Sequence, residues 1–227
     1  MDIVLIAGMW LDGSAWDAVV PELERLGHRP VSLTLPGQGE GNADATYEDQ
    51  VASVLAALDA ADGPALVVGH SAASTLAWVA ADARPEKVAR VALIGGMPSP
   101  DGETYFGFFE PVEGVVPFPG WEPFEGPDSD DMSPEQKESV AADAIAVPAA
   151  VTQGVVHLND ERRYDVPVTL VCPEFTPAQA KEWIDGGEVP ELAKATRLKY
   201  VDIDSGHWPM FTQPRELARI LADCTDG

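Results

Sequence analysis

Cysteine is scarce in this chain of 227 residues, and the two that are present, Cys172 and Cys224, lie far apart. Two cysteines cannot make a disulfide framework, and this pair lacks the close spacing of a metal site. Cys172 stands within an apolar run and Cys224 near the C-terminus. We therefore assign a function to neither.

Basic residues are also few: lysine and arginine total 14, aspartate and glutamate total 38, and the formal net charge is −24 at pH 7. A charge of this sign repels nucleic acids and anionic membrane surfaces. Long apolar runs are missing as well, since none approaches the roughly 20 residues of a membrane span. The apolar segment after Met1 is too short for a secretory signal. We expect a cytoplasmic, acidic protein that binds neither nucleic acid nor membrane.

Short, nearly continuous apolar segments rich in β-branched residues recur along the chain. Such segments are typical of strands buried on both faces. They span 2–8, 30–36, 65–71, 88–96, 166–173 and 198–204, and helical patterns lie between or after them at 16–26, 47–60, 72–83, 177–185 and 214–222. The alternation predicts an α/β fold with about six strands in a mainly parallel sheet and helices on both of its faces.

One long segment, residues 98–164, interrupts this alternation and contains no predicted strand of the sheet. Its first half is rich in proline, glycine and aromatic residues, and Ser133, Pro134 and Gln136 form a capping-box pattern that predicts the start of a helix. An excursion of this length within a compact domain is usually a lid or a binding element. The sequence therefore predicts a single domain with a cap inserted after the fourth strand. The core comprises residues 1–97 and 165–227, and the cap comprises residues 98–164.

A small hydroxyl ends the third predicted strand, in the stretch ALVVGHSAAS at 65–74. In an open parallel sheet, ligands bind at the carboxyl ends of the strands, and Ser71 stands at such an end with a helix predicted directly after it. A serine between small residues at a sharp strand-to-helix turn is typical of a nucleophile whose hydroxyl projects above the sheet. We interpret Ser71 as that nucleophile.

A nucleophilic serine needs a histidine within reach as its base. Of the four histidines, His28 lies in a charged turn, His70 is expected to point away from the chemistry, and His157 belongs to the predicted cap. His207 follows the last predicted strand, so it stands at the same edge of the sheet as Ser71. We therefore predict that His207 is the base.

These features carry a resemblance to the α/β-hydrolases that covers nearly the whole chain. It rests on LIAGMW at the first strand end, LTLPGQGEG after the second strand, GHSAAS, IGGMP and SGHWPMF, and on the chain order of serine, acid and histidine. Residues 7–40 are similar to the branch that holds plant methylesterases, hydroxynitrile lyases and small bacterial esterases. The resemblance implies an oxyanion hole formed by the backbone N–H groups of Met9 and Ala72. Relatives usually have a second glycine two residues after the nucleophilic serine in this sharp turn, the nucleophile elbow, and Ala73 stands there instead. Ala7 replaces a histidine that often precedes the glycine of the oxyanion loop, here Gly8.

The acid of the implied triad has several candidates. The resemblance implies an aspartate just after the fifth predicted strand, but the sequence there reads PEFTP, and its carboxylate is Glu174. We favour Glu174. Asp101 and Glu103, which follow the fourth strand, are the alternatives if the acid has moved by one strand. Asp204 is a third, with a turn-capping role as its simpler interpretation.

Seven of the 17 aromatic residues lie between positions 105 and 124, within the predicted cap. This density suggests an apolar lining for an acyl or aryl group above Ser71. The acidic run at Asp128, Asp130 and Asp131 is interpreted as a solvated helix entrance and not as a calcium site. The residues expected to line the pocket are Trp10, Phe106, Phe109, Trp121 and Trp208.

The pattern predicts a serine hydrolase that cleaves a small-molecule carboxylic ester, thioester or lactone through an acyl-enzyme, without a metal or another cofactor. One alternative is a non-catalytic small-molecule binding protein, since a fold alone does not establish activity. A lyase of the hydroxynitrile type is another, but that resemblance would imply a lysine near His207 and a hydroxyl in the loop after the first strand. Trp208, Gly8 and Met9 stand at these places instead.

Overall fold

The sheet of this protein has six parallel strands in the order β2-β1-β3-β4-β7-β8. The computed structural model describes residues 1–39 and 43–225, so the end of the LTLPGQGEG stretch and the last two residues lie outside the described part. The strands are β1 (Asp2–Ile6), β2 (Arg29–Leu33), β3 (Ala65–His70), β4 (Val88–Ile94), β7 (Val168–Cys172) and β8 (Leu198–Asp202). All six predicted strands are confirmed. Each ends one to three residues before its predicted end, because the chain turns away there into the loops at the carboxyl edge of the sheet.

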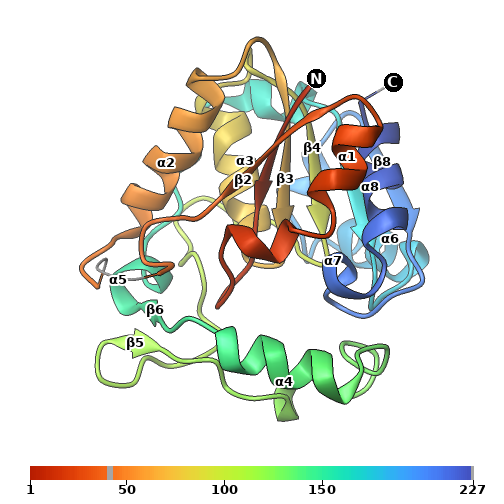
Figure 1. Ribbon diagram of the computed structural model, residues 1–227. Coiled ribbons are helices and arrows are strands. Elements are labelled where there is room, and N and C mark those ends of the chain that lie inside the picture. The colour runs from red at the N-terminus through yellow and green to blue at the C-terminus, as the bar shows by residue number, and fades with distance from the viewer. Residues whose placement is uncertain (40–42, 226–227) are drawn as a thin grey trace.

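Helices cover both faces of the sheet, as predicted (Figure 1). Successive residues of a strand point to opposite faces, so Val4 and Ile6 pack in one apolar cluster with α2, α3 and α6. Ile3 and Leu5 pack in the other with α1 and α8. The helices are α1 (Val20–Arg25), α2 (Tyr47–Asp59), α3 (Ala73–Ala83), α6 (Pro177–Asp185), α7 (Pro209–Thr212) and α8 (Pro214–Asp223), with 3-10 turns η1 (Gly13–Trp16) and η4 (Leu192–Lys194). In the described ranges, no helix is long and apolar enough to cross a membrane.

The predicted helix at 16–26 is shorter than expected, whereas the other four helices predicted outside 98–164 agree to within one residue. The chain first forms η1, which is capped by Asp12 through a hydrogen bond from the Ser14 N–H. Helix α1 starts only at Val20, directly before Pro21. Proline fits the first turn of a helix but breaks its interior, so Pro21 fixes where α1 begins.

Residues 98–164, here called the insertion, contribute no strand to the six-stranded sheet. Figure 1 shows β5, β6 and α4 below the sheet, away from the helices that flank it. The predicted capping box is present: the Ser133 hydroxyl accepts from the Gln136 N–H, and the Gln136 side chain accepts from the Ser133 N–H. The elements between β4 and β7 are β5 (Val115–Val116) and β6 (Val147–Pro148), which pair antiparallel, together with η2 (Glu122–Phe124), α4 (Pro134–Asp143), α5 (Ala149–Thr152) and η3 (Glu161–Asp165).

A buried ionic cluster joins the end of the insertion to the rest of the protein. Arg163 of η3 lies with Nη1 3.0 Å from Asp82 Oδ1 on α3 and with Nε 2.9 Å from Glu191 Oε2, just before η4. Trp78 donates its indole N–H to the same Glu191 oxygen at 2.9 Å. Burial acts to raise the pKa of Glu191, but the hydrogen bonds from Arg163 and Trp78 outweigh it and hold that pKa below its usual value. One cation therefore forms ion pairs with two buried carboxylates.

We expect Arg163→Met to lower the free energy of unfolding by about 3–5 kcal/mol, because it leaves two carboxylates buried without their cation. The matched control is Arg162→Met, which removes an exposed ion pair with Asp160 and should change stability by about 1 kcal/mol or less. Urea unfolding at pH 7 measures both. Equal effects of the two substitutions would show that the cluster does not hold the insertion in place.

Candidate active site

Ser71 follows β3 directly and has a left-handed backbone conformation, with φ at +55°. This region is unfavourable for a residue with a side chain, and such strain persists only where the surrounding structure enforces it. Here the Ser71 N–H donates to Ile94 O of the neighbouring strand β4 at 2.8 Å. The hydrogen bond holds the turn and leaves the Ser71 side chain at the carboxyl edge of the sheet.

Glycines surround this turn because there is no room for side chains. A Cβ added at Gly96 would lie 2.3 Å from Ser71 O, and one at Gly8 would lie 3.0 Å from Ser71 Cβ. A Cβ at Gly69 would lie 2.4 Å from the carbonyl oxygen of Ala73 in the first turn of α3. The close helix contact also explains why a residue as small as Ala73 follows the elbow.

His207 and Glu174 form a hydrogen-bonded pair beside this turn. Glu174 Oε1 lies 2.8 Å from His207 Nδ1, and each side chain is 14% exposed. A carboxylate only accepts, so Nδ1 carries the proton and Nε2 is left as an acceptor. Gly95, with φ at +56°, makes room for the pair, since a Cβ there would lie 3.1 Å from both Glu174 Oε2 and His207 Nδ1. The backbone at Gly95 thus packs directly against the Glu174–His207 pair.

The other predicted acids lie elsewhere. Asp101 is exposed, and its Oδ1 accepts a hydrogen bond at 2.9 Å from the Leu158 N–H inside the insertion. Glu103 and Asp204 are also exposed. Of the four predicted acids, Glu174 in the loop after β7 is the one whose carboxylate is hydrogen-bonded to His207.

His70 does not point away from the site, contrary to the prediction. Its Nε2 donates to the His207 carbonyl oxygen at 2.8 Å, and the two imidazole centroids are 4.9 Å apart. Burial and the nearby His207 lower the pKa of His70 to about 3. His70 is therefore a neutral, buried group that fixes the backbone of the histidine loop. Its position beside Ser71 in the sequence gives no sign of the direction in which the His70 ring points.

The acidic run of the insertion also contacts the histidine loop. Asp130 and Asp131 are exposed, as expected for a solvated helix entrance, whereas Asp128 is half-buried. The Asp128 carbonyl accepts from the His207 N–H at 2.8 Å. Asp131 Oδ2 accepts from the Gly206 N–H at 2.9 Å, where a Cβ would lie 2.3 Å from Asp128 O. Burial raises the pKa of the Asp128 carboxyl, which faces the same cavity as His207. The insertion thus holds the loop that carries His207.

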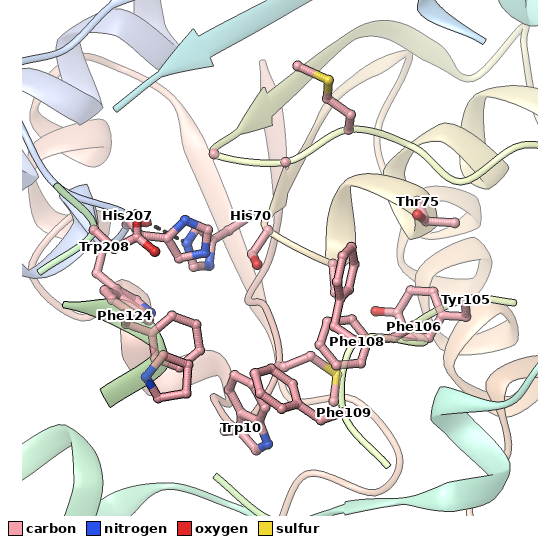
Figure 2. Close-up of a pocket in the computed structure, with 18 of the residues that line it drawn as sticks. Trp10, His70, Thr75, Tyr105, Phe106, Phe108, Phe109, Phe124, His207 and Trp208 are labelled. Carbon is pink, nitrogen blue, oxygen red and sulfur yellow. Dashed lines mark hydrogen bonds between the residues drawn. The ribbon is translucent and has the colours of Figure 1, made fainter. Parts of the chain in front are cut away.

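Ser71 and His207 share one cavity of about 410 Å³. Figure 2 shows His207 and Trp208 on one side of it, Phe106, Phe108 and Tyr105 on the other, and Trp10 below. Its walls come from the strand-end loops and the insertion together. The lining residues are Met9, Trp10, His70, Ser71, Ala72, Thr75, Gly95, Gly96, Met97, Ser99, Tyr105, Phe106, Phe108, Phe109, Pro123, Phe124, Asp128, His207 and Trp208.

Four of the five residues predicted to line the pocket do so, and Trp121 does not. Its indole N–H donates to the Lys137 carbonyl at 3.0 Å, and its ring packs edge-on against Trp208 at 5.2 Å. Trp121 therefore lies behind Trp208, in a second layer of aromatic residues outside the cavity wall. The sequence pattern located the aromatic cluster but did not separate its two layers.

The Met9 and Ala72 amides, implied as the oxyanion hole, both belong to residues that line the cavity. Neither N–H donates to another group in the part of the chain that the structure describes. The same ranges contain no cluster of three or more His, Cys, Asp or Glu residues arranged to hold a metal. Around Ser71, the cavity therefore offers a hydroxyl, the His207 imidazole and two backbone N–H groups without a partner in the described ranges.

The low pKa of His70 makes a testable link between pH and stability. The unfolded chain takes up a proton near pH 6.5 whereas folded His70 stays neutral to about pH 3, so His70 destabilises the fold progressively as the pH falls through this window, by up to about 1.4 kcal/mol per pH unit. In His70→Gln the amide N–H can still reach His207 O, but the titration is lost. We expect the unfolding free energy of the wild type to fall more steeply than that of the variant between pH 6.5 and 4. Parallel curves would contradict this account.

Comparison with known proteins agrees with the fold and the resemblance. The model of the alpha/beta hydrolase family matches residues 3–220. Methylesterase 7 of Arabidopsis thaliana is 24% identical over 98% of this chain and 95% of its own length. A pyrethroid hydrolase of Sphingobium wenxiniae is 32% identical over 49% of this chain and 41% of its own.

Among solved structures, an extracellular α/β-hydrolase from a Paenibacillus species superposes with a TM-score of 0.78. It is described as sharing structural and functional homology with tobacco salicylic acid binding protein 2. The match covers 98% of both chains at 19% identity, and so concerns the fold. The six-stranded parallel sheet, the serine turn after β3 and the family match together show that this chain belongs to the α/β-hydrolase family.

Proposed function

We propose that this protein is a serine hydrolase that cleaves carboxylic esters, or related thioesters or lactones, of small molecules. The observation that carries the proposal is that strained Ser71 and His207 open onto one cavity while Glu174 binds His207 Nδ1 at 2.8 Å. This combination supplies a nucleophile, a base and a group that orients the base. The relatives named methylesterase and pyrethroid hydrolase support ester cleavage.

The first half of the proposed reaction acylates the serine. His207 Nε2 takes the proton of Ser71 Oγ as Oγ attacks the carbonyl carbon of the ester, and the electron pair of the C=O bond moves onto its oxygen. The Met9 and Ala72 N–H groups stabilise this oxyanion, and one such donor is typically worth about 3 kcal/mol. The tetrahedral intermediate collapses, the C–O bond to the alcohol breaks, and the alcohol leaves with the proton from His207.

The second half releases the acid. Water attacks the acyl-Ser71 carbonyl and gives its proton to His207 Nε2, and collapse then expels Ser71 Oγ, which recovers that proton. In both halves Glu174 stabilises the positive charge that forms on His207 and holds the ring in position. Every proton moves between substrate, water and these side chains, so the proposed reaction needs no metal or other cofactor.

The insertion serves in this proposal as the cap that gives the cavity its apolar wall. Trp10 lies at the centre of that wall, with its ring centroid 5.6 Å from Phe109 and 5.5 Å from Phe118. Its indole N–H donates to Val116 O at 3.2 Å, which ties it to β5. A wall of this kind favours small esters with apolar acyl or alcohol groups. No lysine lines the cavity within the described ranges, which weighs against the lyase alternative.

Labelling by a fluorophosphonate separates a serine hydrolase from a non-catalytic binding protein. We expect the wild type to be labelled and to hydrolyse short-chain p-nitrophenyl esters, because the elbow presents an activated hydroxyl. Ser71→Ala should lose the label and at least about 10³-fold of kcat. Ser74→Ala, which removes the next serine along, buried in α3, is the control. A wild type that neither reacts with the phosphonate nor cleaves any ester would overturn the proposal.

The acid is tested by a pair of neutral replacements. Glu174→Gln should lower kcat by roughly 10²–10⁴-fold, since the amide can donate to Nδ1 and stabilise the wrong tautomer of His207. Asp101→Asn should leave kcat within about twofold, because its carboxylate binds the Leu158 N–H instead. Steady-state hydrolysis of p-nitrophenyl butyrate measures both. The reverse pattern would move the acid to the loop after β4.

A further inference from the structure

The hydroxyl of Tyr105 is a polar group on an otherwise aromatic wall of the cavity. Tyr105 lines the cavity and is only 5% exposed. Figure 2 shows its hydroxyl pointing toward the pocket, on the side of Phe106 and Phe108. Its hydroxyl makes no hydrogen bond with any residue that the structure describes. Unlike the Tyr47 hydroxyl, it is not one of the fully enclosed polar atoms without a partner, so a ligand in the cavity can reach it and form a hydrogen bond with it.

Tyr105 is held firmly in place by the backbone around it. Its N–H donates to Gly154 O at 2.8 Å, and the next N–H, of Phe106, donates to Thr152 O at 3.0 Å. The Ser99 N–H donates to Thr75 Oγ1 at 3.0 Å, which fixes two further hydroxyl residues of the same cavity. Figure 2 places Thr75 and Tyr105 on one side and His207 on the other. The cavity therefore has a second polar end, opposite the imidazole.

The chemistry of ester cleavage decides which part of a substrate meets that end. His207 Nε2 gives its proton to the leaving alcohol, so the alcohol lies on the His207 side. The acyl group stays on Ser71 and extends the other way, toward Tyr105. Burial raises the pKa of the Tyr105 phenol, so it keeps its proton and acts as a donor. No lysine or arginine in the described ranges lines the cavity, and Asp128 adds a carboxyl to it, so anionic groups are disfavoured.

We propose that the Tyr105 hydroxyl donates a hydrogen bond to an uncharged oxygen, such as a ketone or ether oxygen, in the acyl group of the substrate. The inference rests on the proposed ester hydrolase function and names the class of acyl group that the site selects. A site built to hydrogen-bond a substrate discriminates against the analogue that lacks the bonding group, because its own polar group is then left unpaired. Tyr105 is thus a specificity residue and takes no part in bond breaking.

Paired chromogenic esters test this selectivity. We would compare p-nitrophenyl oxoalkanoates, with the ketone at the fourth, fifth or sixth carbon, with the plain alkanoates of equal length, after subtraction of uncatalysed hydrolysis. For at least one ketone position the wild type should show kcat/KM higher by about tenfold or more. Tyr105→Phe should abolish this preference through KM, because the bond is present before and during the chemical step. The readout is the ratio of kcat/KM for the oxo ester to kcat/KM for the plain ester, which a general change in the activity of Tyr105→Phe does not alter.

The matched control is Tyr47→Phe. The Tyr47 ring packs against Tyr105 at 5.0 Å, but its hydroxyl is fully enclosed, has no hydrogen-bond partner in the described ranges, and does not line the cavity. Tyr47→Phe should keep the oxo-ester preference.

Equal turnover of oxo and plain esters by the wild type, or a preference that survives in Tyr105→Phe, would overturn this inference alone. Absence of any ester turnover and of phosphonate labelling would overturn the proposed function as well, so the two failures are distinguishable. Thermal unfolding of both variants should match the wild type, since neither lost hydroxyl has a partner.

Discussion

The left-handed turn at Ser71 is the constraint on which the rest of the site depends. The backbone of Ser71, at φ +55°, is strained because the residue carries a side chain. The hydrogen bond from the Ser71 N–H to Ile94 O helps to hold this conformation. The same turn brings neighbouring backbone so close that Gly8 and Gly96 cannot carry a Cβ. The ends of β1, β3 and β4 therefore meet at this point, and the residues there have small side chains or none. The Ser71 hydroxyl, at the centre of this close packing, faces the cavity.

A second constraint links the insertion to the position of His207. The histidine loop is held by three contacts from different parts of the chain: Glu174 on its imidazole, His70 on its carbonyl and the Asp128 carbonyl on its N–H. The first two come from the ends of β7 and β3, and the third comes from the insertion. The same insertion supplies the aromatic wall. Substrate binding and the placement of His207 are therefore structurally coupled, since both depend on how the segment from β4 to β7 packs over the sheet.

The sequence was informative where local pattern decides structure. Continuous apolar segments gave the six strands, and the small residues around Ser71 and the loop position of His207 placed both at one edge. It was less informative where a side chain's direction depends on distant parts of the chain. The orientation of His70 depends on the loop after β8, and that of Trp121 depends on a carbonyl of α4. The sequence favoured Glu174 over Asp101 because Glu174 lies in the loop after the fifth predicted strand. In the structure Glu174 binds His207, whereas Asp101 binds the Leu158 N–H.

The cavity's lining shows the same limit. Aromatic density predicted an apolar wall in the insertion, but Tyr105 stood in that pattern as one ring among seven. Its hydroxyl differs from the other rings because the backbone carbonyls of Thr152 and Gly154 fix this segment with the hydroxyl facing the cavity. There it has no hydrogen-bond partner in the described ranges. Long-range backbone pairing of this kind has no signature in a single sequence. The selectivity proposed for Tyr105 therefore depends on the folded chain and has no counterpart in the composition or the motifs.

The central claim, that Ser71 carries the acyl group during ester cleavage, is tested most directly by catching that group on the protein. With enzyme in excess over p-nitrophenyl butyrate, samples quenched in acid at successive times would be digested and analysed by mass spectrometry. The account predicts that the peptide containing Ser71 gains a butyryl group as p-nitrophenol is released and then loses it, with fragmentation locating the group on Ser71. Release of p-nitrophenol and butyrate with no acyl group on Ser71 at any time would contradict it.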